Sequence, residues 1–296
     1  MMVSAQIDAH LPRLTPAERR VAAVVADDPE AVAFGTVADV ARRAGASGAT
    51  VVRLSAKLGF DGFVDLQAAV REELARRLRP ASERIRRPAP GDVLGTALAV
   101  EMGNVAATLE GVDRGAFDNA VALLSGAASG RGGSARSGAR ERRGSERALV
   151  LSGDASSGIA SLFAGELSML RPNVVLAGGS EVRVARLLAD VGPGDVVVTI
   201  DLARYDRAVL DAAGRAAERG AALVALTDSA LSPLASAATV SFTASVTGPG
   251  PFDSHVGLLA LANALLTGVA ARLRTSATDR LDRLEAAWRA TAVLTD

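Results

Sequence analysis

The chain has 296 residues with 33 basic and 33 acidic side chains, so its formal net charge is zero. This balance excludes a protein that coats nucleic acid through its overall charge, and DNA contacts would have to come from a local basic patch. The sequence contains no cysteine and only two histidines, which excludes disulfides, thiolate catalysis and cysteine-ligated zinc and leaves little for a histidine metal site. We therefore expect no metal and no cofactor, and the length favours two domains.

Residues 1–78 have the pattern of an all-α domain. Thr15-Pro16-Ala17-Glu18 supplies an N-cap, a proline at the first helical position and a carboxylate three residues after the cap. Valines at helical spacing follow this start signal, and Asp61 can cap a later helix that runs through Leu74.

Residues 36–60 predict two short amphipathic helices joined by a tight turn at Gly45. Each helix has a single apolar stripe, formed by Val37, Val40 and Ala41 in the first and by Val51, Leu54 and Leu58 in the second. Gly45 suits the left-handed end of the first helix, and Ser47 suits the N-cap of the second. This is the layout of a DNA-binding helix-turn-helix, although part of an ordinary helical bundle has the same pattern.

The polar stripe of the second helix carries side chains that suit the major groove. Arg53 can donate two hydrogen bonds to a guanine edge, Thr50 can contact a base, and Ser47 can hold a phosphate at the helix start. Residues 40–60 contain four basic and no acidic side chains. The candidate DNA-binding residues are Arg43, Ser47, Gly48, Ala49, Thr50, Arg53 and Lys57.

Two arginine-rich segments lie between the parts of the chain for which the sequence predicts regular structure. Residues 79–93 are expected to form a linker, because six arginines and three prolines gather between positions 76 and 90. A solvated tether is favoured there over a contact with the DNA backbone. Residues 125–146 are small or basic and predict a flexible insertion, since they cannot bury apolar area.

The second domain, residues 94–296, predicts a three-layer α/β sandwich around a five-stranded parallel sheet. Five apolar runs, too short for helices, lie at 148–151, 173–177, 195–200, 221–226 and 239–242. Residues 254–271 lack formal charge but include several polar side chains, which favours a buried helix over a membrane span. With no secretory signal at the start, we expect a cytoplasmic protein without a membrane contact.

Ligands of parallel sheets bind at the carboxyl ends of the strands, which directs attention to three loops. The loop after Leu151 offers Ser156 and Ser157 to an anion, although small residues are also what a tight turn needs. The loop after Leu226 offers Thr227 and Ser229.

His255 follows an aspartate and a serine, but adjacent helical residues point about 100° apart, so no catalytic triad is expected. Capping by Asp253 or Ser254 explains that cluster, and His255 either lines an effector pocket or is structural.

The order of these parts resembles the RpiR-type bacterial transcriptional regulators, which join a helix-turn-helix to a sugar isomerase (SIS) domain that binds sugar phosphates. The resemblance covers nearly the whole chain and is carried most specifically by residues 14–32, 57–67 and 218–235. It implies that Ser47, Thr50 and Arg53 lie on the recognition helix. It also implies that Ser157 corresponds to the serine of the first phosphate loop.

The chain departs from this family after its third strand. A serine-rich loop is usual there, whereas Asp201, Arg204, Tyr205 and Asp206 stand in this sequence. Two carboxylates would repel a phosphate unless Arg204 offsets them, so we expect sugar-phosphate binding to be weakened, altered or lost. Arg204 and Tyr205 either recognise another anion or form a capped, ion-paired loop, and the latter is favoured. The candidate effector residues are Ser156, Ser157, Asp201, Arg204, Tyr205, Thr227, Ser229 and His255.

The sequence thus predicts a DNA-binding transcriptional regulator without enzymatic activity, whose second domain senses a sugar phosphate or another small metabolite. A homo-oligomer, a dimer or a tetramer, would bind a palindromic operator in double-stranded DNA. The alternatives are a sugar-phosphate isomerase and a SIS-type scaffold without an effector.

Overall fold

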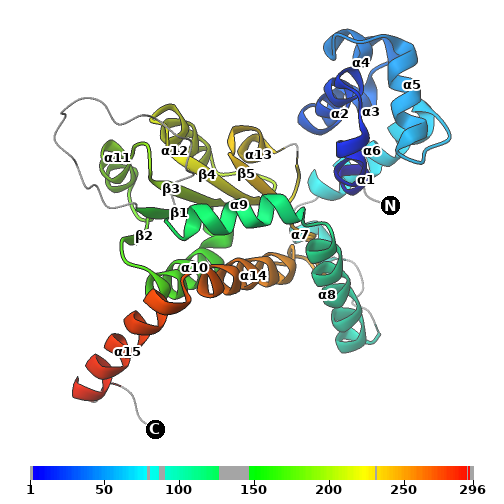
Figure 1. The fold of residues 1–296 in the computed structure, drawn as a ribbon. Coiled ribbons are helices and arrows are strands. Elements are labelled where there is room, and N and C mark those ends of the chain that lie inside the picture. Colours follow the sequence, from blue (N-terminus) through cyan, green and yellow to red (C-terminus); the bar gives the residue numbers. More distant parts are fainter. Residues whose placement is uncertain are drawn as a thin grey trace, which may run out of the picture. The chain divides into compact units, whose positions relative to one another are not determined.

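The structure is a computed structural model that describes residues 3–78, 81–86, 91–126, 147–230, 232–291 and 293. It divides into two compact units, which are described separately (Figure 1). The first contains residues 1–103, 229–236 and 247–254, and the second contains residues 104–228, 237–246 and 255–296. The expected insertion at 125–146 lies outside the described residues from position 127 onward, as do positions 79, 80 and 87–90 of the expected linker.

The first unit begins with a helical domain, as predicted. Its elements are α1 (Val3–His10), the 3-10 turn η1 (Leu11–Arg13), α2 (Pro16–Asp27), α3 (Pro29–Phe34), α4 (Val37–Arg43), α5 (Gly48–Lys57) and α6 (Phe63–Leu78). Capping boxes start α2 at Thr15 and α4 at Thr36, because in each the cap hydroxyl and the third-position carboxylate satisfy each other's backbone N–H. Val51 and Leu54 of α5 and Leu58 directly after it are fully buried in the core of this domain.

Two helices, α7 (Ala81–Arg84) and α8 (Val93–Glu110), follow the helical domain in the chain. Asn104 and Thr108, near the end of α8, are buried polar residues that bond to Ser245. Helix α9 (Arg114–Leu124) then precedes the sheet.

The second unit contains the predicted five-stranded parallel sheet. The strands are β1 (Ala148–Ser152), β2 (Val174–Leu176), β3 (Val196–Ile200), β4 (Ala222–Thr227) and β5 (Val240–Thr243), in the order β2-β1-β3-β4-β5. All four pairings are parallel, and Ser152 at the end of β1 stands opposite Ile200 at the end of β3. The chain therefore moves outward from β1 to one side and then to the other, so the strand order reverses between β1 and β3.

Helices cover both faces of this sheet. They are α10 (Ser157–Leu170), preceded by the 3-10 turn η2 (Asp154–Ser156), α11 (Glu181–Ala189), α12 (Arg207–Glu218) and α14 (Val256–Arg272). In Figure 1, α10 and α14 lie on one face, and α11 and α12 lie on the other. The elements α13 (Pro233–Ala237) and α15 (Arg274–Thr291) complete the chain.

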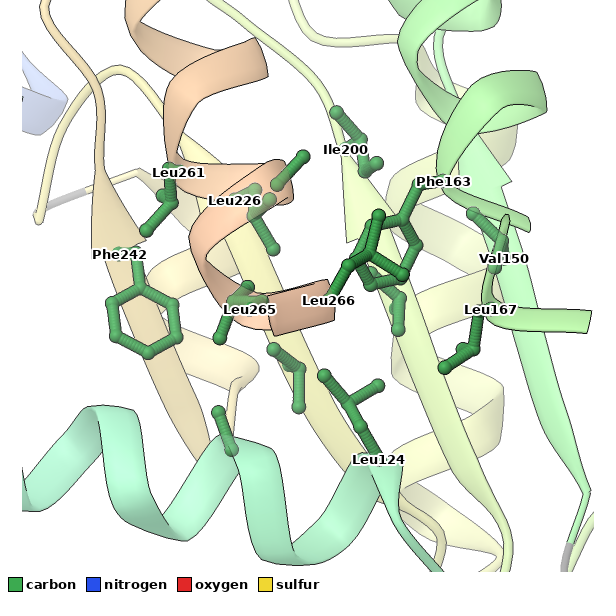
Figure 2. Close-up of a cluster of buried hydrophobic side chains, with 14 of the residues drawn as sticks. Leu124, Val150, Phe163, Leu167, Ile200, Leu226, Phe242, Leu261, Leu265 and Leu266 are labelled. Atoms are coloured by element: carbon green, nitrogen blue, oxygen red, sulfur yellow. The ribbon is translucent and has the colours of Figure 1, made fainter. Parts of the chain in front are cut away.

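The apolar core of the second unit lies between the sheet and helices α9, α10 and α14. Figure 2 shows Phe163 and Leu167 of α10 and Leu261, Leu265 and Leu266 of α14 gathered against Val150, Ile200 and Leu226 of the strands. Their burial explains why the uncharged run at 254–271 forms a core helix. Among the described residues, no single helix has both the length and the apolar composition to cross a membrane. Helices α14 and α15 meet these two criteria only when they are taken together, and the pair is bent by 101°.

Candidate functional site

The turn between α4 and α5 is held by its glycine and by an arginine of α2. Gly45 has a φ of +54°, the left-handed conformation that the sequence predicted for this position. Arg20 donates to the carbonyl oxygens of Ala44 and Gly45, each at 3.0 Å. Ser47 then caps α5 by accepting from the backbone N–H of Thr50 at 3.3 Å. These contacts fix the direction in which α5 leaves the turn.

One face of α5 is exposed and carries no carboxylate. Ser47 and Arg53 lie on it as predicted, together with Ala49, and Gly48 is half-buried where a side chain would press against Val37. The face also contains Val52, whose side chain is 46% exposed, and Ala56. Val52 is not among the predicted residues, because the apolar pattern alone does not distinguish this valine from its buried neighbour Val51.

Thr50 corrects the predicted polar stripe. Its side chain is only 5% exposed, so it is not available to contact a base, contrary to the expectation. Thr50 stands one residue before Val51 and four before Leu54, so it lies beside the buried stripe of the helix. Its hydroxyl lies 2.9 Å from the Ser47 hydroxyl and accepts a hydrogen bond from Arg53 at 3.3 Å. Thr50 therefore connects the cap of α5 to the arginine of its exposed face.

Lys57 also has a structural contact that the sequence did not reveal. Its ammonium donates to Glu18 of α2 at 2.8 Å, and Glu18 is only 5% exposed. The hydrogen bond from Lys57, together with that from the Thr15 backbone, lowers the pKa of Glu18 from 4.5 to about 2. The pair attaches the end of α5 to the start of α2.

Ion pairs also engage the arginines of α4. Arg43 pairs with Asp28 and Arg42 pairs with Asp39, and all four side chains remain partly exposed. Within the described parts of the chain, Arg53 is thus the basic side chain of residues 40–60 that pairs with no carboxylate. Its guanidinium is exposed on α5 with donors to spare.

A second site is expected at the carboxyl ends of β1 and β3, where the strand order reverses. Asp201, directly after β3, is 4% exposed and accepts from the backbone N–H of Leu202 at 3.0 Å and of Asp206 at 2.7 Å. Burial raises the pKa of Asp201 against the opposing effect of these two bonds. A Cβ on Gly153, directly after β1, would lie 2.2 Å from an oxygen of this carboxylate. The Asp201 carboxylate therefore fills the space between the two strand ends.

The rest of the loop after β3 is capped, as expected, but not ion-paired. Asp206 caps α12 by accepting from the backbone N–H of Ala208 at 2.8 Å. Tyr205 donates to Asp228 at 2.6 Å, and the buried Thr227 contacts the same carboxylate at 3.4 Å. Arg204 has a φ of +73° and an exposed side chain that forms no ion pair within the described part of the chain. The exposed Arg204 therefore does not offset the carboxylates of this loop, and the ion-paired part of the favoured expectation is wrong.

The remaining candidate effector residues occupy different settings. Ser156 is fully buried and its hydroxyl has no hydrogen-bond partner among the described residues, whereas Ser157 is exposed at the start of α10. Ser229 is buried and belongs to the first compact unit. His255 is half-buried at the N-cap position of α14, and its Nε2 is buried without a partner in the described residues.

The residues before α14 form contacts that the sequence did not predict. Ser254 donates to Glu101 and Asp253 accepts from Arg84, and the N-cap position itself is taken by His255, whose side chain forms no capping hydrogen bond. In the described part of the chain, no three His, Cys, Asp or Glu side chains are grouped so that they could hold a metal ion.

Comparison with known proteins assigns both units. Residues 1–77 match the helix-turn-helix domain of the rpiR family, and residues 143–268 match the SIS domain. The HTH-type transcriptional regulator HexR of Pseudomonas aeruginosa is 26% identical over 90% of this chain and 88% of its own length.

Two solved structures have the same fold. The sugar isomerase domain of an RpiR transcription factor from Sphaerobacter thermophilus is 26% identical, with a TM-score of 0.56 over 66% of this chain and 99% of its own. The Vibrio vulnificus NanR protein, solved in complex with ManNAc-6P, is 21% identical, with a TM-score of 0.56 over 97% of this chain and 98% of its own. With a helix-turn-helix of the rpiR family followed by a SIS domain, the chain is a DNA-binding transcriptional regulator of the RpiR type.

Proposed function

We propose that α5 is the helix that recognises operator DNA and that Arg53 makes its principal base contact. The observation that carries this proposal is the exposed, unpaired guanidinium of Arg53 on a helix face without carboxylates. Bidentate donation to O6 and N7 of guanine is the commonest specific contact of an arginine in the major groove. Ser47, Ala49 and the backbone at Gly48 lie at the start of the same helix, where they face the groove or its phosphates.

Thr50 and Lys57 act differently in this proposal from the other candidates. Thr50 orients Arg53, and Lys57 holds α5 against α2. Arg43 keeps an exposed side chain beside Asp28, so it contributes a phosphate contact only when it leaves that pair.

The experiment is the substitution Arg53→Ala, measured on a DNA fragment that the wild-type protein selects from a random library. We expect binding to weaken by about 1–3 kcal/mol and discrimination at one guanine to be lost. Arg186→Ala, at an exposed arginine of α11, is the matched control and leaves operator binding unchanged. Unchanged binding by a folded Arg53→Ala protein would contradict the proposal.

For the SIS domain, we propose a regulatory role without catalysis, in which a small metabolite is the effector. The Vibrio vulnificus relative was solved with a sugar phosphate, which makes this ligand class the first to examine. In the present chain, however, Asp201 already occupies two backbone donors at the end of β3. We infer that this loop does not accept a phosphate dianion and that any effector is recognised by other groups.

A sugar-phosphate isomerase is the alternative for this domain, and a coupled isomerase assay decides between the two. The hydrogen bonds of Asp201 favour a regulatory domain over an isomerase, because a carboxylate that already accepts from two backbone N–H groups is poorly placed to transfer a substrate proton. We further propose that the protein acts as a homodimer on a palindromic operator and works in the cytoplasm, where bacterial DNA lies.

A further inference from the structure

We propose that Val52, flanked by Ala49 and Ala56, forms an apolar strip on α5 that selects thymine through its 5-methyl group. The inference rests on the proposed role of α5 and adds a second base to the guanine that Arg53 contacts. Val52 would be a specificity-determining residue that works by apolar contact rather than by hydrogen bonding.

The geometry of α5 sets Val52 apart from the core residues around it. Val51 and Leu54 are fully buried, whereas Val52 is 46% exposed. Ala49, Val52 and Ala56 recur at i, i+3 and i+7, so they lie along one face of the helix, and all three are exposed. Arg53 is adjacent to Val52 on this exposed side.

The chemistry of the major groove identifies the occupant of this strip. Of the groups that the four bases present there, the thymine methyl is the apolar one. Helix α5 reads GATVVRLSAK and contains no asparagine, glutamine, aspartate or glutamate. It therefore lacks the side chains that pair with adenine or accept from cytosine. Apart from Lys57, which is paired with Glu18, its exposed side chains are one guanidinium and one apolar strip.

Electrostatics favours DNA over an apolar protein surface as the partner. The exposed face of α5 contains basic side chains and no carboxylate. A strip of one valine and two alanines beside an unpaired arginine is also small for a protein interface, whereas it matches the size of one or two methyl groups. Valine is restricted at χ1, so little conformational entropy is lost when it contacts a base.

The test combines a base change with a side-chain change. Uracil differs from thymine only by the missing methyl group, so each thymine of the selected operator is replaced by uracil in turn. For the wild type, we expect uracil beside the guanine to weaken binding roughly fourfold, the equivalent of one buried methyl group. For Val52→Ala, thymine and uracil at that position should bind equally, and both should match the wild type on uracil.

Val64→Ala is the matched control, because Val64 is 79% exposed on α6 and lies on another helix. This variant should keep the full uracil effect. An equal uracil effect in the wild type and in Val52→Ala would overturn the inference, as would a selected half-site without thymine next to the guanine. Failure of the proposed function gives a different result, since the wild type would then select no sequence or Arg53→Ala would bind normally.

Discussion

Glu18 is the residue whose buried charge joins the cap of α2 to the end of α5. Its carboxylate accepts from the Thr15 backbone N–H at 2.8 Å, from the Thr15 hydroxyl at 2.9 Å and from Lys57 at 2.8 Å. A capping box is a local device, whereas the bond to Lys57 spans 39 positions of the chain. One carboxylate therefore stabilises both a helix start and the seating of the recognition helix.

We predict that Glu18→Gln lowers the free energy of unfolding by roughly 1–2 kcal/mol at neutral pH, because the amide weakens three bonds to a buried acceptor. The pKa of Glu18 is about 2 in the folded protein and 4.5 in the unfolded chain. Its stabilisation is therefore fully present above pH 4.5 and lost as the pH falls towards 2. Urea unfolding of both proteins between pH 7 and pH 2 should show the difference shrinking over this window. Glu110→Gln, at an exposed carboxylate of α8, is the control, and a difference independent of pH would contradict the assignment.

The sequence predicted the exposed helix correctly, but it did not predict which individual side chains on that helix are free. Gly45 and Ser47 could be placed because turn and cap positions have local chemical requirements. Thr50, Val52 and Lys57 could not, because their environments depend on how α5 is rotated against α2 and on a partner, Glu18, that is distant in the chain. The charge run alone also overstated the free positive charge, since Lys57, Arg42 and Arg43 are all paired.

Among the elements, the end of β3 shows most clearly how this chain departs from a phosphate site. Asp201 accepts from two backbone N–H groups, which are therefore not free to bind an anion, and Gly153 leaves space for its carboxylate. Replacing Gly153 would introduce a Cβ against Asp201, so the two residues depend on each other.

We predict that calorimetric titration of the wild type with hexose 6-phosphates, including ManNAc-6P, gives no specific heat. Asp201→Ser removes a charge and releases two backbone donors, so this variant should gain measurable binding. Asp154→Ser is the matched control, because it removes the charge of an exposed carboxylate near the same strand end without releasing those donors. Tight binding by the wild type would show that the Asp201 carboxylate moves aside for phosphate.

The elements themselves were largely predictable. All five apolar runs became strands, and β1, β3 and β4 are almost continuously hydrophobic because the central strands of a parallel sheet are buried on both faces. The loops at their ends were located correctly, and the capping of α12 was expected, but most of their other side-chain contacts were not. Arg204 has an exposed side chain without an ion pair in the described residues, and Ser254 bonds to the distant Glu101, since such contacts depend on packing that a linear pattern does not encode.

For the whole molecule, we predict a homodimer of twice the 30.1 kDa chain mass. Two recognition helices then contact successive major grooves, which requires half-sites centred about 10–10.5 base pairs apart, or a multiple of that spacing. Light scattering coupled to gel filtration measures the mass, and footprinting measures the spacing. A monomer that protects a single half-site would contradict this prediction, and a tetramer would extend the spacing to further multiples.

The hydrogen-bonded series Ser47, Thr50 and Arg53 has a consequence for the thermodynamics of operator binding. An arginine loses about 2 kcal/mol of rotamer freedom when it becomes fixed. In this protein, the hydrogen bond to Thr50 restricts the Arg53 side chain before DNA binds. Part of the rotamer entropy of Arg53 is therefore lost when the protein folds and is not lost again when it binds the operator. Thr50→Val would keep the shape but release the guanidinium, so operator binding by that variant should show a less favourable entropy with a nearly unchanged enthalpy.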